Sequence, residues 1–296
     1  MAKSLGQIHT VNKVYTIPVA SGADTKYLLD LPGQLSGQLQ TMVRQGQFFK
    51  VVGIDMKVQS PTAGQGGMVA GELRYFAPTR GRCEAYKNAY HAVRRGMELQ
   101  GINIRGNRNY DFRVPIDKIG DYVNGASILN LATIDGTNGL SMTGATQNND
   151  DIFEVYNKNI QPTQGAVSFD PGFGLPGGAS PTPVDFVLQE GEIFDASMTR
   201  SASESLESIP FQLSFTPGST EVAFEMEWRP DPALYLAVLC GMFEVSIQEI
   251  ESAASTNLDL YVAVHVSGWK SIMGNPDKKR RTRRKSSSKK HRGRKK

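Results

Sequence analysis

Hydrophobic and polar residues alternate along several segments of the chain. In residues 50–58, the side chains of Val52, Ile54, Met56 and Val58 fall on one face of an extended strand. A period of two is typical of a strand that is buried on one side. The same alternation predicts strands in residues 67–77, 211–216, 221–228, 243–247 and 258–266, the last of which ends near Trp269.

Weaker alternation marks further candidate strands. Pro217 and Gly218 form a turn signal between residues 211–216 and 221–228, so these two strands are predicted to pair as a hairpin. The weaker candidates are residues 14–19, 27–31, 111–116, 127–134, 152–156 and 184–188.

Two segments have helical spacing instead. Hydrophobic residues recur every three or four positions in residues 35–44 and, more clearly, in residues 83–95. Residues 136–183 are rich in Gly, Asn, Thr and Pro, which indicates long loops or an insertion. Because strands do not alternate with long helices, the pattern favours an all-β sandwich or jelly roll. A faint similarity between residues 48–54 and 242–247 leaves a duplicated, double jelly roll as an alternative.

Charge is distributed unevenly over the 296 residues. Thirteen of the 33 Lys and Arg lie from Lys278 onward, where there is no Asp or Glu. Residues 1–277 therefore hold the remaining 20 basic residues against all 29 acidic ones, a net charge of −9, although the whole chain carries +4. An acidic body with a basic end is typical of a protein that binds nucleic acid or another anionic surface.

The basic end has the composition of a disordered arm. It contains no apolar side chain to bury, and its like charges repel. Such an arm neutralises phosphates and releases counterions without reading a base sequence. Its candidate nucleic-acid-binding residues are Lys278, Lys279, Arg280, Arg281, Arg283, Arg284, Lys285, Lys289, Lys290, Arg292, Arg294, Lys295 and Lys296.

The arm also permits other interpretations. Residues 278–285 satisfy the pattern of a nuclear localisation signal, and a targeting or solubilising role alone is the alternative to nucleic-acid binding. Membrane binding is disfavoured, because no amphipathic helix adjoins the arm.

A second group of cations surrounds the clearer predicted helix. Cations interleaved with aromatic rings are one way to bind a single strand. The alternative, which we favour, is an amphipathic helix whose tyrosines pack on the sheet while its cations are solvated or form ion pairs. The possible secondary contacts are Arg80, Arg82, Lys87, Arg94 and Arg95, with Arg105 and Arg108 further along and Tyr86, Tyr90 and Tyr110 among them.

Motifs for catalysis or for a cofactor are not expected. Residues 172–177 match G-x-G-x-x-G, but Pro176 and the surrounding loop composition do not fit the strand-then-helix context of that motif. Two cysteines without a C-x-x-C pair and four scattered histidines argue against a zinc site. The chain begins without the apolar core of a signal peptide and has no run of 18 apolar residues, so we expect a soluble protein that is not exported by the ordinary route.

Four parts of the chain carry a family resemblance. The first is the strand at residues 14–19, followed by a short helical segment. The second is the aromatic-led strand of residues 47–58, which is similar to a Y-x-I-x-x-V-x-V pattern, and the third is the apolar strand of residues 258–266 with Trp269. With the basic arm, these features resemble the jelly-roll capsid proteins of small single-stranded DNA viruses. Here the arm is C-terminal, whereas in many such capsids it is N-terminal.

The resemblance implies a fold and a function. Residues 1–10 would be a flexible N-terminus, residues 11–272 a jelly-roll shell domain, and residues 273–296 an arm inside the shell. The protein would assemble with itself into an icosahedral virion around a genome, expected to be single-stranded DNA, without cofactor, metal, membrane or enzymatic activity. Assembly in the host nucleus is compatible with the arm. The alternative is a non-capsid nucleic-acid-binding protein with a nuclear localisation tail.

Overall fold

A computed structural model describes the parts of the chain that form the body. These are residues 7–19, 25–59, 67–99, 101, 110–117, 119–125, 139–142, 149–153, 206–215, 225–231, 234–252 and 257–273. The arm, most of residues 136–183 and the candidate strands at residues 127–134 and 184–188 lie outside the described residues.

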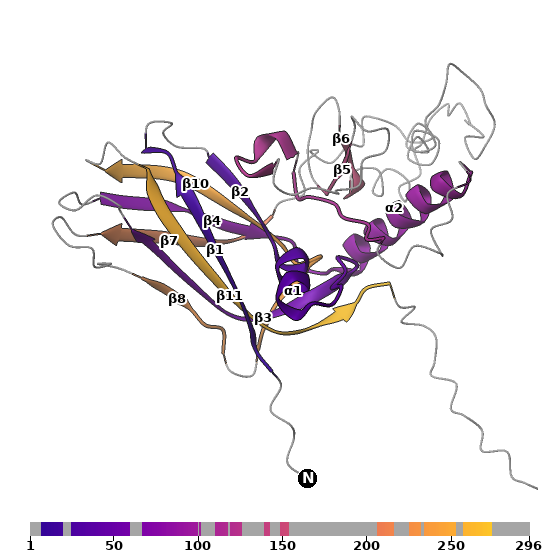
Figure 1. The fold of residues 1–296 in the computed structure, drawn as a ribbon, viewed down its shortest axis with the longest axis horizontal. Coiled ribbons are helices and arrows are strands. Elements are labelled where there is room, and N and C mark those ends of the chain that lie inside the picture. Colours follow the sequence, from indigo (N-terminus) through magenta and orange to yellow (C-terminus); the bar gives the residue numbers. More distant parts are fainter. Residues whose placement is uncertain are drawn as a thin grey trace, which may run out of the picture.

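Two antiparallel sheets pack face to face (Figure 1). The first sheet has the strand order β1 (His9–Ile17), β11 (Leu258–Ser271), β3 (Gln47–Gln59) and β8 (Met226–Trp228), and β9 (Leu236–Leu239) also pairs with β3. The second sheet has the order β2 (Thr25–Asp30), β10 (Met242–Ser252), β4 (Gly67–Tyr75) and β7 (Glu207–Phe215). The short strands β5 (Gly139–Ser141) and β6 (Asn149–Asp151) form a separate parallel pair. The all-β class predicted from the sequence is confirmed.

The period of two in the sequence produces the core between the sheets. Along β11, the inward side chains are at most 1% exposed, whereas the residues between them are partly exposed. Burying one such Val or Leu stabilises the fold by about 1.5–3 kcal/mol, so a one-residue slip of the strand would be costly. The inward residues of β11 are Leu258, Leu260, Val262, Val264 and Val266, and Phe243, Val245 and Ile247 of β10 lie on the facing sheet.

The predicted buried face of β3 is only partly correct. Ile54, Met56 and Val58 are buried as expected, but Val51 is fully buried and Val52 is not. The cause is a β-bulge. Val266 pairs with Val51 and His265 pairs with Gly53, so Val52 has no partner across the ladder and the alternation changes phase there.

The predicted hairpin between residues 211–216 and 221–228 is wrong. β7 pairs with β4 in the second sheet, whereas β8 pairs with β3 in the first. The chain therefore crosses from one sheet to the other between β7 and β8. A turn signal between two amphipathic strands predicts the change of direction but not the neighbour to which each strand pairs.

Both predicted helices are present, with different ends. α1 (Leu31–Leu39) begins four residues before the prediction, because Asp30 caps it by accepting a hydrogen bond from the Gly33 N–H at 3.1 Å. It ends where Gln40 adopts a left-handed conformation, with φ of 53°. α2 (Arg80–Leu99) contains all of predicted residues 83–95 and extends beyond them at both ends.

A second hydrophobic cluster lies at the end of the sandwich from which α2 projects (Figure 1). α2 contributes Ala85, Tyr86, Ala89 and Val93. Residues 111–116 contribute Phe112, Val114 and Ile116, but they form no strand, so the prediction of a strand there is wrong. At residues 152–156, the described Ile152 and Phe153 are buried but lie outside any strand. A short helical turn, η3 (Ile119–Asp121), follows residues 111–116.

The two halves of the chain share both sheets. β1 pairs with β11, and β2 pairs with β10, so strands from the beginning and the end of the chain are neighbours. The similar residues 48–54 and 242–247 fall in β3 and β10, which belong to different sheets. Within the described residues, they are therefore not equivalent parts of two repeated domains. The first strand starts at His9, two residues before the predicted domain boundary.

Candidate nucleic-acid interface

The point at which the arm leaves the body is defined, although the thirteen cations of the arm lie outside the described residues. Ile272 is buried, and its N–H donates to the Gly46 carbonyl at 3.1 Å. A Cβ placed on Gly46 would be 3.1 Å from Cγ of Met273 and 3.6 Å from the ring of Tyr86. Met273 therefore lies beside α2, five residues before Lys278.

One cation of α2 is part of the fold. Arg82 forms an ion pair with Glu207 at 2.7 Å and donates to the Ala77 carbonyl at 3.1 Å. Its guanidinium also lies 4.8 Å from the ring centre of Phe76, and its side chain is only 11% exposed. Arg82 thus joins α2 to β7, and its guanidinium is already used in contacts within the fold rather than in binding a ligand.

The other cations lie nearer the surface of α2. Two of them form ion pairs with a carboxylate four residues further along the helix. Arg80 and Glu84 are 3.5 Å apart, and Arg94 and Glu98 are 3.1 Å apart. Such pairs contribute about 0.3–0.5 kcal/mol, so a polyanion can displace the carboxylates. Arg95 is exposed and Lys87 is half-buried. Binding by this surface stays a prediction.

The tyrosines near α2 are packing residues. Tyr86 is buried and its hydroxyl donates to the Phe112 carbonyl at 2.6 Å. Tyr90 packs edge-to-face on Phe112, with ring centres 5.8 Å apart. Partial burial raises the pKa of Tyr110 to about 12. For these rings the structure agrees with the packing interpretation, while Arg105 and Arg108 lie outside the described residues.

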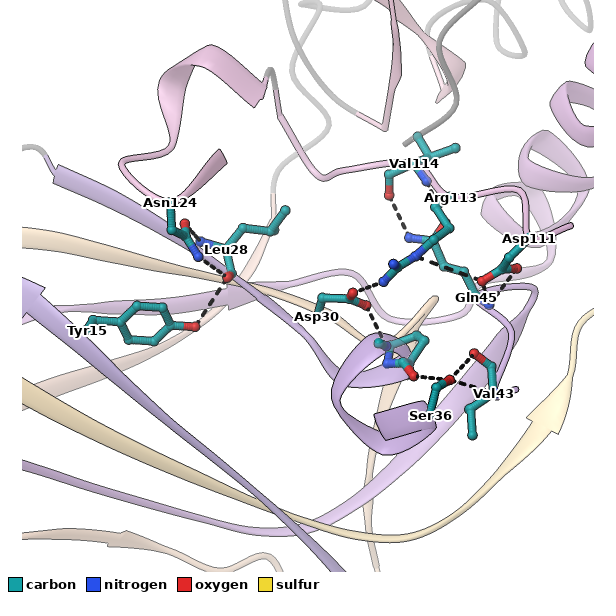
Figure 2. A network of polar contacts seen from close by, with 12 residues as sticks. Tyr15, Leu28, Asp30, Ser36, Val43, Gln45, Asp111, Arg113, Val114 and Asn124 are labelled. Carbon is teal, nitrogen blue, oxygen red and sulfur yellow. Dashed lines mark hydrogen bonds and ion pairs between the residues drawn. The ribbon is translucent and has the colours of Figure 1, made fainter. Parts of the chain in front are cut away.

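A buried amide holds the segment that follows α2 (Figure 2). The side chain of Gln45 is fully buried, its Nε2 donates to the Val114 carbonyl at 2.7 Å, and its Oε1 accepts from the Val114 N–H at 2.6 Å. These are the two bonds that a neighbouring strand would make. They satisfy the backbone of Val114, so most of residues 111–116 can be buried without joining a sheet.

An arginine between two carboxylates joins this segment to α1 (Figure 2). Arg113 forms an ion pair with Asp30, the N-cap of α1, and its Nε lies 3.9 Å from Asp111. Both oxygens of Asp111 accept from the Gln45 N–H at 3.3 Å. Burial raises the pKa of Asp111 to about 6, against the opposing effects of that hydrogen bond and of the charge on Arg44.

A second amide covers the free edge of β2 (Figure 2). Asn124 Oδ1 accepts from the Leu28 N–H at 2.9 Å, and its Nδ2 donates to the Leu28 carbonyl at 2.8 Å. The Tyr15 hydroxyl donates to the same carbonyl at 3.2 Å, and the Val123 N–H donates to the Lys26 carbonyl at 3.0 Å. The segment therefore blocks the edge of the second sheet from pairing with another strand.

Sequence reasoning missed a polar row across the first sheet. Thr10 Oγ1 is 2.9 Å from His265 Nδ1, His265 Nε2 is 2.8 Å from Asp55 Oδ2, and Arg229 forms an ion pair with Asp55. Partial burial works to raise the pKa of Asp55, but the hydrogen bonds from Arg229 and His265 outweigh it, so the pKa is lowered. No signal in the sequence joins residues up to 255 positions apart; only the strand register does.

Comparisons with known proteins do not identify this interface. Searches against protein-family models, curated proteins and solved structures find no match. In the described stretches, no group of three or more His, Cys, Asp and Glu side chains is arranged to hold a metal ion. No helix in those stretches is long and apolar enough to cross a membrane.

Proposed function

We propose that this chain is a viral capsid subunit. Its two sheets would form a jelly-roll shell wall, and its basic C-terminal arm would bind the packaged genome, expected to be single-stranded DNA. Copies of the chain would assemble into an icosahedral virion. The arm would also serve as a nuclear localisation signal during assembly.

The observation that carries the proposal is the way the strands are shared between the sheets. β1, β3, β8 and β11 lie in the first sheet, while β2, β4, β7 and β10 lie in the second. The first strand pairs with the last, and the second pairs with the last but one. This order is what two Greek keys folded into a jelly roll require, and jelly rolls are common in viral capsids.

The fold alone does not identify a capsid protein, because lectin and cupin domains also use this kind of fold. The distribution of charge favours a capsid protein over these other classes. A body of net charge −9 does not favour general contact with nucleic acid, whereas the arm carries thirteen cations and no acid. Met273 fixes the start of that arm beside α2. A shell wall that repels polyanion, with an attractive arm on one side of it, suits packaging.

Assembly is the test of the proposal. The full-length protein, mixed with single-stranded DNA and examined by electron microscopy and sedimentation, is expected to form closed particles of uniform size. A monomer at every salt and DNA concentration would exclude the capsid function and favour the non-capsid nucleic-acid-binding protein. Replacing Arg94 and Arg95 by Glu in the same assay measures the share of α2, because it reverses two cations without touching the arm.

A further inference from the structure

Two β-bulges meet in the middle of the first sheet. The pairing of β3 with β11 skips Val52 on one strand and Ser267 on the other, so Gly53 faces His265 and Gly268 faces Lys50. Bulges are common where a sheet re-aims side chains at a binding site. Glycine inside a strand often marks a place where another group comes close to the backbone. We call the surface around these two glycines the bulge patch.

The side chain of Arg229 packs directly on the backbone of Gly53. A Cβ at Gly53 would be 2.9 Å from both Cδ and Nη1 of Arg229, so a larger residue there would displace this side chain from its position. Nη1 donates to the Trp228 carbonyl at 3.0 Å and to the Ile54 carbonyl at 3.3 Å, and it forms the ion pair with Asp55. The guanidinium is therefore fixed, yet its side chain is 44% exposed.

The position of the Arg229 guanidinium suits the binding of an anion. All of its polar contacts within the described residues are made by Nη1, which leaves the Nε and Nη2 edge of the guanidinium for a ligand. That edge matches two oxygens of a phosphate, and a side chain that is already ordered loses little entropy on binding.

An exposed aromatic ring lies at the other side of the patch. Lys50 Nζ is 4.4 Å from the ring centre of Tyr235, and Tyr235 is 43% exposed. Across the ladder from Lys50, nothing lies within 4 Å of where a Cβ of Gly268 would be, so the surface beside the cation is open. An exposed ring with adjacent cations is the arrangement on which nucleic-acid bases stack.

The surface around the patch carries charges of both signs. Arg229, Lys50 and Lys270 are cations at this end of the sheet. Asp55 is already matched by Arg229 and His265. Glu227, the cross-strand neighbour of Asp55, and Asp231, two residues after Arg229, are two further carboxylates nearby. The two signs are balanced here, so the attraction for a phosphate lies in the guanidinium edge of Arg229 and in Lys50 rather than in an excess of positive charge.

The patch lies on the strand that leads to the arm. Gly268 is five residues before Met273, which corresponds to at most about 17 Å of extended chain. A strand of nucleic acid held by the arm can therefore continue onto the sheet. We infer that the bulge patch is a second binding site for single-stranded nucleic acid, in which Arg229 and Lys50 hold phosphates and a base stacks on Tyr235. This inference rests on the proposed packaging function.

Photochemical crosslinking of the full-length protein tests the inference directly. The probe is oligothymidylate carrying 5-iodouracil, and mass spectrometry maps the crosslinked residue after irradiation. We expect a crosslink at Tyr235 in addition to crosslinks in the arm. Arg229→Glu and Lys50→Glu should each lower the yield at Tyr235 by about tenfold, the size expected for losing one charge-assisted contact and adding repulsion. Arg229→Lys, which keeps the charge but loses the two-pronged donor, should give an intermediate yield.

The same strand supplies a matched control. Lys57 lies on the same face of β3, over the ring of Tyr261 at 5.4 Å, but away from both bulges. Lys57→Glu makes the same charge change as Lys50→Glu and should leave the yield at Tyr235 nearly unaltered. Glu227→Gln should raise it, because it removes a carboxylate beside Arg229. Circular dichroism of each variant checks that the fold is kept.

The outcomes separate this inference from the function on which it rests. Crosslinks confined to the arm or to α2 would overturn the bulge patch and leave the packaging function intact. Absence of any binding by the full-length protein would overturn the packaging function itself. If amine-reactive reagents instead join Lys50 to a second copy of the chain and no nucleic acid reaches Tyr235, the patch is a subunit contact and the inference is wrong.

Discussion

Replacing Asp111 by Asn should stabilise the protein at neutral pH. The Asp111 carboxyl is buried at the junction of α1, β3 and the segment after α2, and its side chain is 13% exposed. Burial raises its pKa from an ordinary 3.8 to about 6. Since the folded protein holds the proton more tightly than the unfolded chain, the free energy of unfolding falls as pH rises from about 4 to about 6 and is level above that.

The size of the effect follows from the shift in pKa. A difference of about two units corresponds to about 3 kcal/mol of stability lost between the two pH values. Asn has no charge to bury and keeps an oxygen to accept the Gln45 N–H, but its amide group needs an acceptor of its own. We therefore expect Asp111→Asn to raise the free energy of unfolding at pH 8 by about 1–3 kcal/mol and to flatten its pH dependence below pH 6.

Urea denaturation at several pH values, followed by tryptophan fluorescence, measures both quantities. Asp117→Asn is the matched control, because Asp117 forms a partly exposed ion pair with Lys26 at 3.1 Å. Asp117→Asn should lower the free energy of unfolding by at most about 1 kcal/mol, whereas Asp111→Asn should raise it. An Asp111→Asn protein that is less stable than the parent at pH 8 would show that Arg44 and Arg113 compensate the carboxylate in full, and the reasoning from burial would be wrong.

Three further predictions concern two glycines and the arm. Gly241→Ala should destabilise the protein by about 2–4 kcal/mol in the same denaturation assay, because φ is +66° and the new Cβ would be 2.6 Å from the ring of Phe49. Gly37→Ala, in α1 with nothing within 4 Å, should instead stabilise it by up to about 1 kcal/mol. Deleting residues 278–296 should remove most affinity for single-stranded DNA and most of its salt dependence, measured by fluorescence anisotropy. A truncated chain with unchanged affinity would place the main site on the body.

The elements that the sequence predicts well are those with a long, regular period. β4, β10 and β11 keep a period of two over most of their length, and α2 keeps helical spacing for five turns, so local pattern and tertiary packing agree. The errors fall where a distant contact decides the structure. Val52 changes the phase of β3 because β11 skips it, and residues 111–116 stay out of the sheets because the Gln45 amide takes the place of a partner strand.

The two candidate sites also differ in whether the sequence alone reveals them. A run of cations is visible in a sequence, so the arm needs no structure to be noticed. The bulge patch can be found only in the structure, because Lys50, Arg229 and Tyr235 come together only through the pairing of β3 with β8, β9 and β11. Gly53 shows the limit most clearly. In the sequence it is a weak point in a strand, and in the structure it is the space that Arg229 occupies.

The position of β11 couples the two sites to completion of the fold. β11 lies between β1 and β3, so the first sheet cannot close until residues 258–271 have been synthesised. The bulge patch does not exist before that pairing, and the anchor of the arm at Ile272 and Met273 forms in the same step. Contacts of such large sequence separation form slowly and late in folding. The arm is therefore held at its anchor only once the first sheet is complete. Under the proposed function, only folded copies of the chain would then present an anchored arm for packaging nucleic acid.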